Sequence, residues 1–238
     1  MSVDTIEQTN PELEVKPELT VEQQKQVERL GSAFHEQWRQ TRLNEQGGFE
    51  PRVKSTSDSA WIEAHGTDQV DIANTSFAEL PSDWQAENAA AAETVVRIIA
   101  KYPEGIDLGD VDTAVAVGDQ IHSAWLARNE WAKDGELGAA FLDLSPAEQD
   151  KDIAQMRTAI NMGMAGFGEK WQQGYARDLV RACEANPDTV PITVRKKIAD
   201  GETTLEDWAK GGAAYVADRE EENVRQYGQA SPSISYYS

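Results

Sequence analysis

Cysteine is almost absent from this sequence, and so are the familiar motifs of covalent chemistry. The 238 residues include one cysteine, Cys183, so the chain can form neither an internal disulfide nor a cysteine-based metal cluster. Cys183 follows an apolar helical pattern, which predicts an inert thiol in the core. No P-loop, no dinucleotide fingerprint and no Gly-x-Ser-x-Gly segment is present. These absences favour a non-catalytic protein, and no cofactor is predicted.

Basic residues are also scarce. The chain has 22 Lys and Arg against 42 Asp and Glu, which gives a formal net charge of −20. A uniformly negative field repels phosphate groups, so neither nucleic acid nor an anionic membrane is expected as a nonspecific partner. An anionic ligand would therefore need a local basic pocket.

Long apolar runs are missing as well. No stretch approaches the roughly 20 apolar residues that span a bilayer. The acidic N-terminus, Met1–Asp4, lacks the basic and apolar regions of a signal peptide, so we expect a cytoplasmic protein. Residues 1–20 predict a flexible acidic leader, and residues 228–238 predict a flexible tail.

Helical periodicity dominates the remainder. Thr20 and Gln23 have capping-box spacing, and apolar residues then recur every three or four positions up to Trp38. Helices are also predicted from Pro81 to before Pro103, around 111–125, from Ser145 to about 164, and in three stretches between 167 and 227. Residues 43–76 break this period and predict an irregular insert with short extended pieces. The fold class is therefore mainly α.

One pattern occurs twice. His35 and Trp38 form an apolar-His-x-x-Trp segment, and His122 and Trp125 repeat it 87 residues later (122 − 35). Each is followed by a helix-opening segment, at 77–81 and 141–146, and these lie 64 residues apart as measured from Leu80 to Leu144 (144 − 80). The pattern predicts a first unit (21–102) with an enlarged insert, a second unit (103–166) and a helical C-terminal extension (167–227).

A basic and aromatic cluster lies in and beside the first insert. Guanidinium groups bind phosphate oxygens bidentately, and an aromatic face can stack on a base. This combination predicts a site for a small anionic, nucleotide-like ligand. The predicted ligand-binding residues are His35, Trp38, Arg39, Arg42, Phe49, Arg52, Lys54, Trp61 and His65.

Two structural explanations compete with that site. The cations can instead pair with carboxylates such as Glu36, Glu50 and Asp58, and His35 with Trp38 can simply form a packed helix face. His65, Asp68 and Asp71 have no spacing specific to a metal, and no metal site is predicted.

The duplicated pattern resembles the RyR domain, the small repeat named after ryanodine receptors and also found in bacterial and phage proteins. The resemblance covers about residues 25–165. It is carried by the segments 33–38, 48–52, 77–81, 85–88, 121–125 and 141–152. The second unit lacks the family's Gly-aromatic-Tyr-Gly segment, and Phe49 stands where the family often has Trp or Tyr. The resemblance implies a mainly helical pair of units with short strands and no catalytic residues to carry over.

These observations predict a non-catalytic module that senses or sequesters a small anionic ligand through the first unit, in a phage–host or stress setting. The alternative is a structural protein whose acidic surface contacts a protein partner and which has no small-molecule ligand. An enzyme would need turnover that depends on His35 or His65. The sequence is also compatible with an oligomer.

Overall fold

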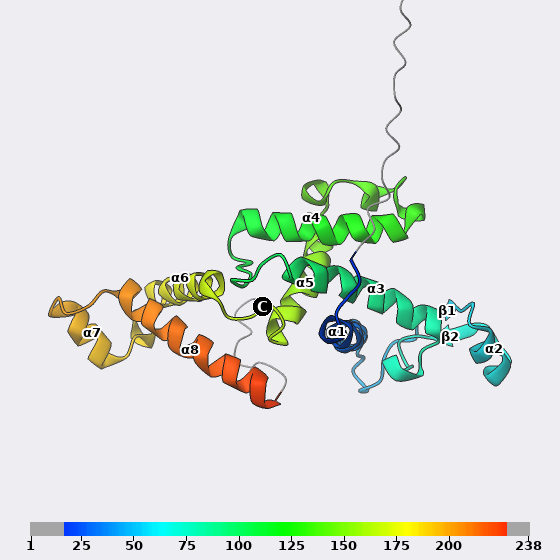
Figure 1. Ribbon diagram of the computed structural model, residues 1–238, viewed down its shortest axis with the longest axis horizontal. Coiled ribbons are helices and arrows are strands. Elements are labelled where there is room, and N and C mark those ends of the chain that lie inside the picture. The colour runs from blue at the N-terminus through cyan, green and yellow to red at the C-terminus, as the bar shows by residue number, and fades with distance from the viewer. Residues whose placement is uncertain (1–16, 228–238) are drawn as a thin grey trace, which may run out of the picture.

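A computed structural model describes residues 17–227, and in this range the chain is mainly helical with one two-stranded sheet (Figure 1). The predicted tail and most of the predicted leader lie outside the described residues. The α-helices are α1 (Val21–Gln40), α2 (Ser59–His65), α3 (Ser82–Ile99), α4 (Val111–Arg128), α5 (Pro146–Asn161), α6 (Glu169–Ala185), α7 (Ile192–Ala199) and α8 (Leu205–Tyr227). The strands are β1 (Val53–Ser55) and β2 (Gln69–Asp71), and short 3₁₀ turns include η1 (Phe77–Glu79), η3 (Glu136–Gly138) and η4 (Phe141–Asp143).

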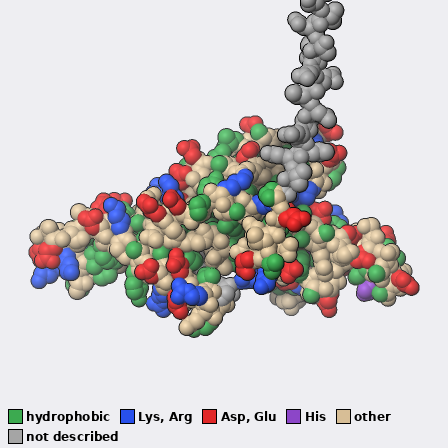
Figure 2. Space-filling view, in the orientation of Figure 1, with side chains coloured by type: hydrophobic (Ala, Val, Ile, Leu, Met, Phe, Trp, Pro, Cys, Tyr) green, Lys and Arg blue, Asp and Glu red, His purple; other side chains and the backbone are tan. Residues whose placement is uncertain are grey.

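The elements have a simple arrangement. Helices α1, α3, α4 and α5 occupy the centre, the β1–α2–β2 insert projects at one end, and α6, α7 and α8 project at the other (Figure 1). Acidic and basic side chains are interspersed over the face shown in Figure 2. None of the helices within residues 17–227 has the length and apolar character needed to cross a membrane.

Two predicted helix starts are confirmed by their hydrogen bonds. At the start of α1, Gln23 N donates to Thr20 Oγ1 (3.2 Å) and Thr20 N donates to Gln23 Oε1 (2.9 Å). At the start of α5, Glu148 N donates to Ser145 Oγ (3.3 Å). Such caps satisfy amides that have no partner within the helix, and each typically contributes about 1 kcal/mol.

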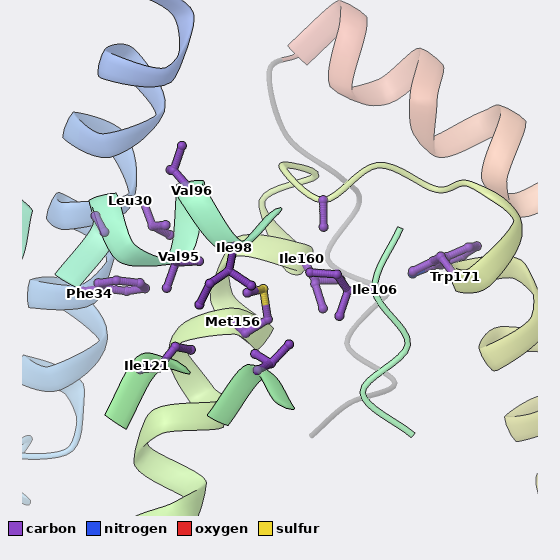
Figure 3. Packing of buried hydrophobic residues seen from close by; sticks show 14 of the residues in the cluster. Leu30, Phe34, Val95, Val96, Ile98, Ile106, Ile121, Met156, Ile160 and Trp171 are labelled. Atoms are coloured by element: carbon purple, nitrogen blue, oxygen red, sulfur yellow. The ribbon is translucent and has the colours of Figure 1, made fainter. Parts of the chain in front are cut away.

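One continuous core joins the central helices to the extension (Figure 3). Each fully buried aliphatic or Phe side chain contributes roughly 1.5–3 kcal/mol relative to exposure. Trp171 of α6 is 1% exposed, stacks on Tyr175 and meets the edge of Phe167, so α6 is docked through aromatic contacts. The labelled core side chains are Leu30, Phe34, Val95, Val96, Ile98, Ile106, Ile121, Met156, Ile160 and Trp171.

The extension is also held by a buried ion pair. Asp107, in the loop before α4, is buried and accepts from both terminal nitrogens of Arg177 on α6, at 2.7 and 2.9 Å. A bidentate pair of this kind fixes orientation as well as distance.

The insert contains a helix that the sequence did not predict. Residues 43–76 were expected to be irregular with extended pieces. The two strands do pair antiparallel, with Lys54 opposite Val70, but α2 lies between them. Asp58 caps α2 by accepting from Ala60 N and Trp61 N, and it also accepts from Ser82 N at the start of α3. The cap therefore depends on a partner 24 residues away, which no local pattern reveals.

The first and second units share one long-range contact. His35 Nε2 lies 2.9 Å from Thr75 O, and His122 Nε2 lies 3.1 Å from Ala139 O. Both imidazoles are buried on the inner face of a helix. Each histidine therefore ties its helix to the segment just before the next 3₁₀ turn.

The units also share a contact around that turn. Gln85 Nε2 lies within hydrogen-bonding distance of three successive carbonyl oxygens of η1 and its end, and Gln149 Nε2 does the same at η4. The acceptors are Phe77, Ala78 and Leu80 in the first unit, and Phe141, Leu142 and Leu144 in the second. Acceptors of one unit lie 64 residues from those of the other, the same offset as the two glutamines.

Candidate functional site

The predicted ligand-binding residues surround a small second core in the first unit. Val70, Ile72 and Leu80 form its buried centre. Four partly buried aromatic side chains pack against that centre: Trp38, Trp61, Phe77 and Trp84. Trp38 and Trp61 thus come together from α1 and α2, but they do so as part of a packed cluster.

Arg52 and Lys54 lie on the same face of the hairpin as this aromatic core. Lys54 pairs with Val70, and Arg52 O accepts from Ile72 N (3.0 Å), so both cations are opposite core residues. Cross-strand neighbours share a face, and alternate residues of one strand do too. Among residues 17–227, no carboxylate lies within ion-pair distance of either side chain.

Arg42 adds a third cation to this face. Its Nε donates to Glu50 O (3.0 Å), and its guanidinium carbon lies 5.7 Å from the Trp38 ring centroid. A carbonyl group orients the guanidinium without neutralising it. We call Arg42, Arg52 and Lys54, with Trp38 and Trp61, the basic face of the first unit.

Arg39 is used differently. It donates to both carboxylate oxygens of Glu36 (2.8 and 3.0 Å) and to Ala73 O (2.8 Å), and it lies over the Phe49 ring at 4.4 Å. Its charge is offset and its side chain is largely buried. For Arg39 and Phe49, the packing explanation fits better than the ligand explanation.

The two histidines of the predicted site are also engaged. His35 is buried against Thr75 O and lies near Trp38 and Phe77. His65 is exposed at the end of α2, where it stacks on Trp61 with ring centroids 3.9 Å apart. Neither imidazole belongs to the basic face.

Three aspartates hold the insert together through hydrogen bonds. Backbone donation from Ser82, then from Trp61, lowers the pKa of Asp58 to about 2. The pKa values of Asp71 and Asp83 are also lowered, because hydrogen bonds outweigh the opposing effect of partial burial. Asp83 accepts from Thr56 Oγ1 and from the amide and hydroxyl of Ser57. These carboxylates are occupied as acceptors and do not neutralise the nearby cations.

A cavity of about 260 Å³ lies in the second unit, beside His122. We call it the second-unit cavity. Trp125 supplies an aromatic wall, and Leu137 and Leu144 supply apolar surface. Its polar lining consists of His122, Glu148, Lys151, Asp152 and Gln155.

A buried His–Asp pair lies at this cavity. His122 Nδ1 is 3.2 Å from Asp152 Oδ2, and the residues are 4% and 9% exposed. Burial raises the pKa of Asp152 to about 6, against the opposing effect of His122. Because Ala139 O can only accept, Nε2 of His122 carries a proton, and a proton on Nδ1 makes the ring a cation.

The corresponding region of the first unit is filled. At the offset of 64 residues, Glu148 corresponds to Trp84 and Asp152 corresponds to Asn88. Trp84 packs on the cluster that contains Leu80, which corresponds to Leu144 at the cavity, and its indole Nε1 donates to Ser55 O of the hairpin. A bulky indole in one unit thus stands where the other has a glutamate beside open space. Reasoning from sequence missed the cavity, although this alignment of the two units contained the signal.

A larger cavity, about 640 Å³, lies between α6 and α8. Ala176 and Val180 give it apolar surface, and charged side chains such as Arg181, Glu206 and Lys210 surround it. Within the described residues, no group of three His, Cys, Asp or Glu side chains is placed to hold a metal ion. No family model, no curated protein and no solved structure matches this chain.

Proposed function

We propose that this protein is a non-catalytic binding module that recognises a small anionic, nucleotide-like ligand through the basic face of the first unit. The observation that carries the proposal is the placement of Arg52 and Lys54, which have no carboxylate partner within residues 17–227 although the chain has a net charge of −20. They lie on the face of the hairpin that packs against tryptophans.

Each part of this face has a defined role in the proposal. Arg42, held by Glu50 O above Trp38, offers its remaining N–H groups to a phosphate. Arg52 and Lys54 supply charge from the strand, and the partly buried Trp61 supplies a ring for stacking. Binding needs no proton transfer and no covalent step.

We also infer that the two units are copies of one RyR-like fold unit. The matching histidine–carbonyl contacts and the matching glutamine contacts, at constant sequence offsets, support this inference. The inference explains why the insert matters, because it is the largest difference between the two units.

The test is calorimetric titration with nucleoside mono- and diphosphates and with inorganic pyrophosphate. Arg52→Ala/Lys54→Ala should weaken binding about tenfold or more for each cation removed, since a hydrogen bond to a charged group contributes about 1.5–3 kcal/mol. Both side chains lack ion-pair partners among the described residues, so the fold should persist.

The matched control is Lys196→Ala/Lys197→Ala on the exposed surface of α7, which changes the net charge by the same amount. This control should bind as the parent protein does. Equal losses in both double variants would reduce the site to a general charge effect, and absence of binding to every anion would favour the protein-interaction alternative.

A further inference from the structure

The second-unit cavity has the features of a separate ligand site. Its volume of about 260 Å³ exceeds the roughly 150 Å³ of an engineered apolar cavity that binds benzene. One substituted ring therefore fits beside Trp125, between the indole and the two leucines. Its chemistry differs from that of the basic face because its deepest polar group is a carboxyl group.

Asp152 is the polar anchor of the cavity. It is 9% exposed, and Oδ2 is engaged with His122 at 3.2 Å. The other oxygen, Oδ1, has no hydrogen-bond partner among the residues that the structure describes, and Asp152 lines the cavity. A buried carboxylate with an unused oxygen favours a ligand that donates hydrogen bonds and carries positive charge.

The remaining lining supports the same class of ligand. The face of a tryptophan such as Trp125 attracts planar cations, and the side-chain carbonyl of Gln155 can accept a hydrogen bond. Lys151, the one lysine of the lining, is paired with Glu148 at 2.5 Å, so its charge is offset. The lining therefore has more free acceptors than free positive charge.

We propose that the second-unit cavity binds a small planar molecule carrying an amidinium-type group, with the N–H donors on Asp152 and the ring against Trp125. This site is independent of the anionic site proposed for the first unit. In the first unit the same place is occupied by Trp84, and Asn88 replaces the carboxylate.

The probe is benzamidine, with benzamide and benzoate as the neutral and anionic comparisons of the same shape. Binding is measured by calorimetry and by protein NMR, in which the indole N–H signal of Trp125 reports on the cavity. Benzamidine should bind at least tenfold more tightly than either comparison compound.

Two variants copy the first unit into the second. Asp152→Asn removes the charge with little change of shape and should weaken benzamidine binding at least tenfold. Glu148→Trp reproduces Trp84 and should abolish binding by filling the cavity. Asp143→Asn is the matched control, since Asp143 is exposed on η4 outside the cavity lining and carries the same charge.

Affinity should rise from pH 5 to pH 8 while the amidinium remains protonated. The titratable groups that act on Asp152 are His122 of α4 and Glu148 and Lys151 of α5. The His122–Asp152 pair loses protons over this range, which increases its attraction for a cation. This pH profile gives a readout that does not depend on whether a variant folds.

Three results would overturn the proposal. They are benzoate binding as tightly as benzamidine, an unchanged affinity in Asp152→Asn, and benzamidine binding that leaves the Trp125 signal in place. None of them bears on nucleotide binding by Arg52 and Lys54, so the two proposals can fail separately.

Discussion

The first and second units place a histidine, a tryptophan and a glutamine in matching positions, but they fill the space beside the histidine differently. In the first unit, Trp84 and the inserted hairpin occupy it. In the second unit, a short connection and Glu148 leave a cavity of about 260 Å³. The shared contacts maintain the fold, and the space between them is therefore free to differ. The difference separates what a unit needs in order to fold from what it can use to bind.

The largest expected effect concerns two glycines that lie 87 residues apart, the offset of the two histidines. A Cβ on Gly118 of α4 would lie 2.2 Å from Phe141 Cζ, and the Phe141 ring is buried. A Cβ on Gly31 of α1 would meet its nearest atoms at an ordinary 3.5 Å. Gly118→Ala should lower the free energy of unfolding by about 3 kcal/mol. Gly31→Ala should raise it by about 0.5–1 kcal/mol, because alanine favours the helix.

Urea unfolding monitored by circular dichroism measures both changes. A similar destabilisation in the two variants would mean that the helices approach their partners equally closely, and this part of the comparison between the units would be wrong.

The next effect should be equal in the two units. Gln85→Ala and Gln149→Ala each leave the carbonyl oxygens of a 3₁₀ turn without their side-chain donor. Each substitution should cost about 2 kcal/mol, since a net hydrogen bond contributes about 1 kcal/mol and the carbonyls are partly buried. Gln46→Ala, at an exposed side chain, serves as the control. A difference of more than a factor of two between the variants would show that one unit depends on this contact and the other does not.

The smallest effect is a pH dependence of opposite sign in the two units. The folded pKa of Asp58 lies below its usual value, at about 2, so its stabilising contribution is present above about pH 4 and is lost as the pH falls towards 2. The folded pKa of Asp152 lies above its usual value, at about 6, so its ionisation destabilises the fold as the pH rises from about 4 to 6.

Hydrogen exchange from pH 3 to pH 6.5, corrected for intrinsic rates, resolves the two units. On acidification, protection should fall in α2 and the hairpin and should increase around α5. Asp58→Asn and Asp152→Asn should each remove the pH dependence of their own unit only. A uniform response along the chain would contradict this assignment.

Part of the fold follows from local sequence rules. The start of α1 follows from Thr20 and Gln23, and the start of α5 follows from Ser145, because a cap involves residues only three apart. The short strands follow from the extended pieces of the insert. Helix α2 escaped prediction because Asp58 also binds Ser82 N, and seven residues are too few to show a helical period.

The candidate sites were predictable to different degrees. The sequence identified Arg52 and Lys54 of the basic face, since charge and aromatic content are visible in one stretch. It could not separate Arg39 from them, because the bond to Ala73 O forms across 34 residues. The second-unit cavity arises from space that no side chain fills, and a reading of residue types alone does not register such space.

The histidine contacts also bear on the order in which the units form. The contact from His35 to Thr75 closes a loop of 40 residues, and the contact from His122 to Ala139 closes one of 17. Closing the longer loop costs about 0.8 kcal/mol more in chain entropy, from the logarithmic dependence on loop length. During refolding of the complete chain, the second unit therefore has the lower entropic barrier to closure. During synthesis the first unit leaves the ribosome earlier, so the slower-closing unit also has the longer time in which to close.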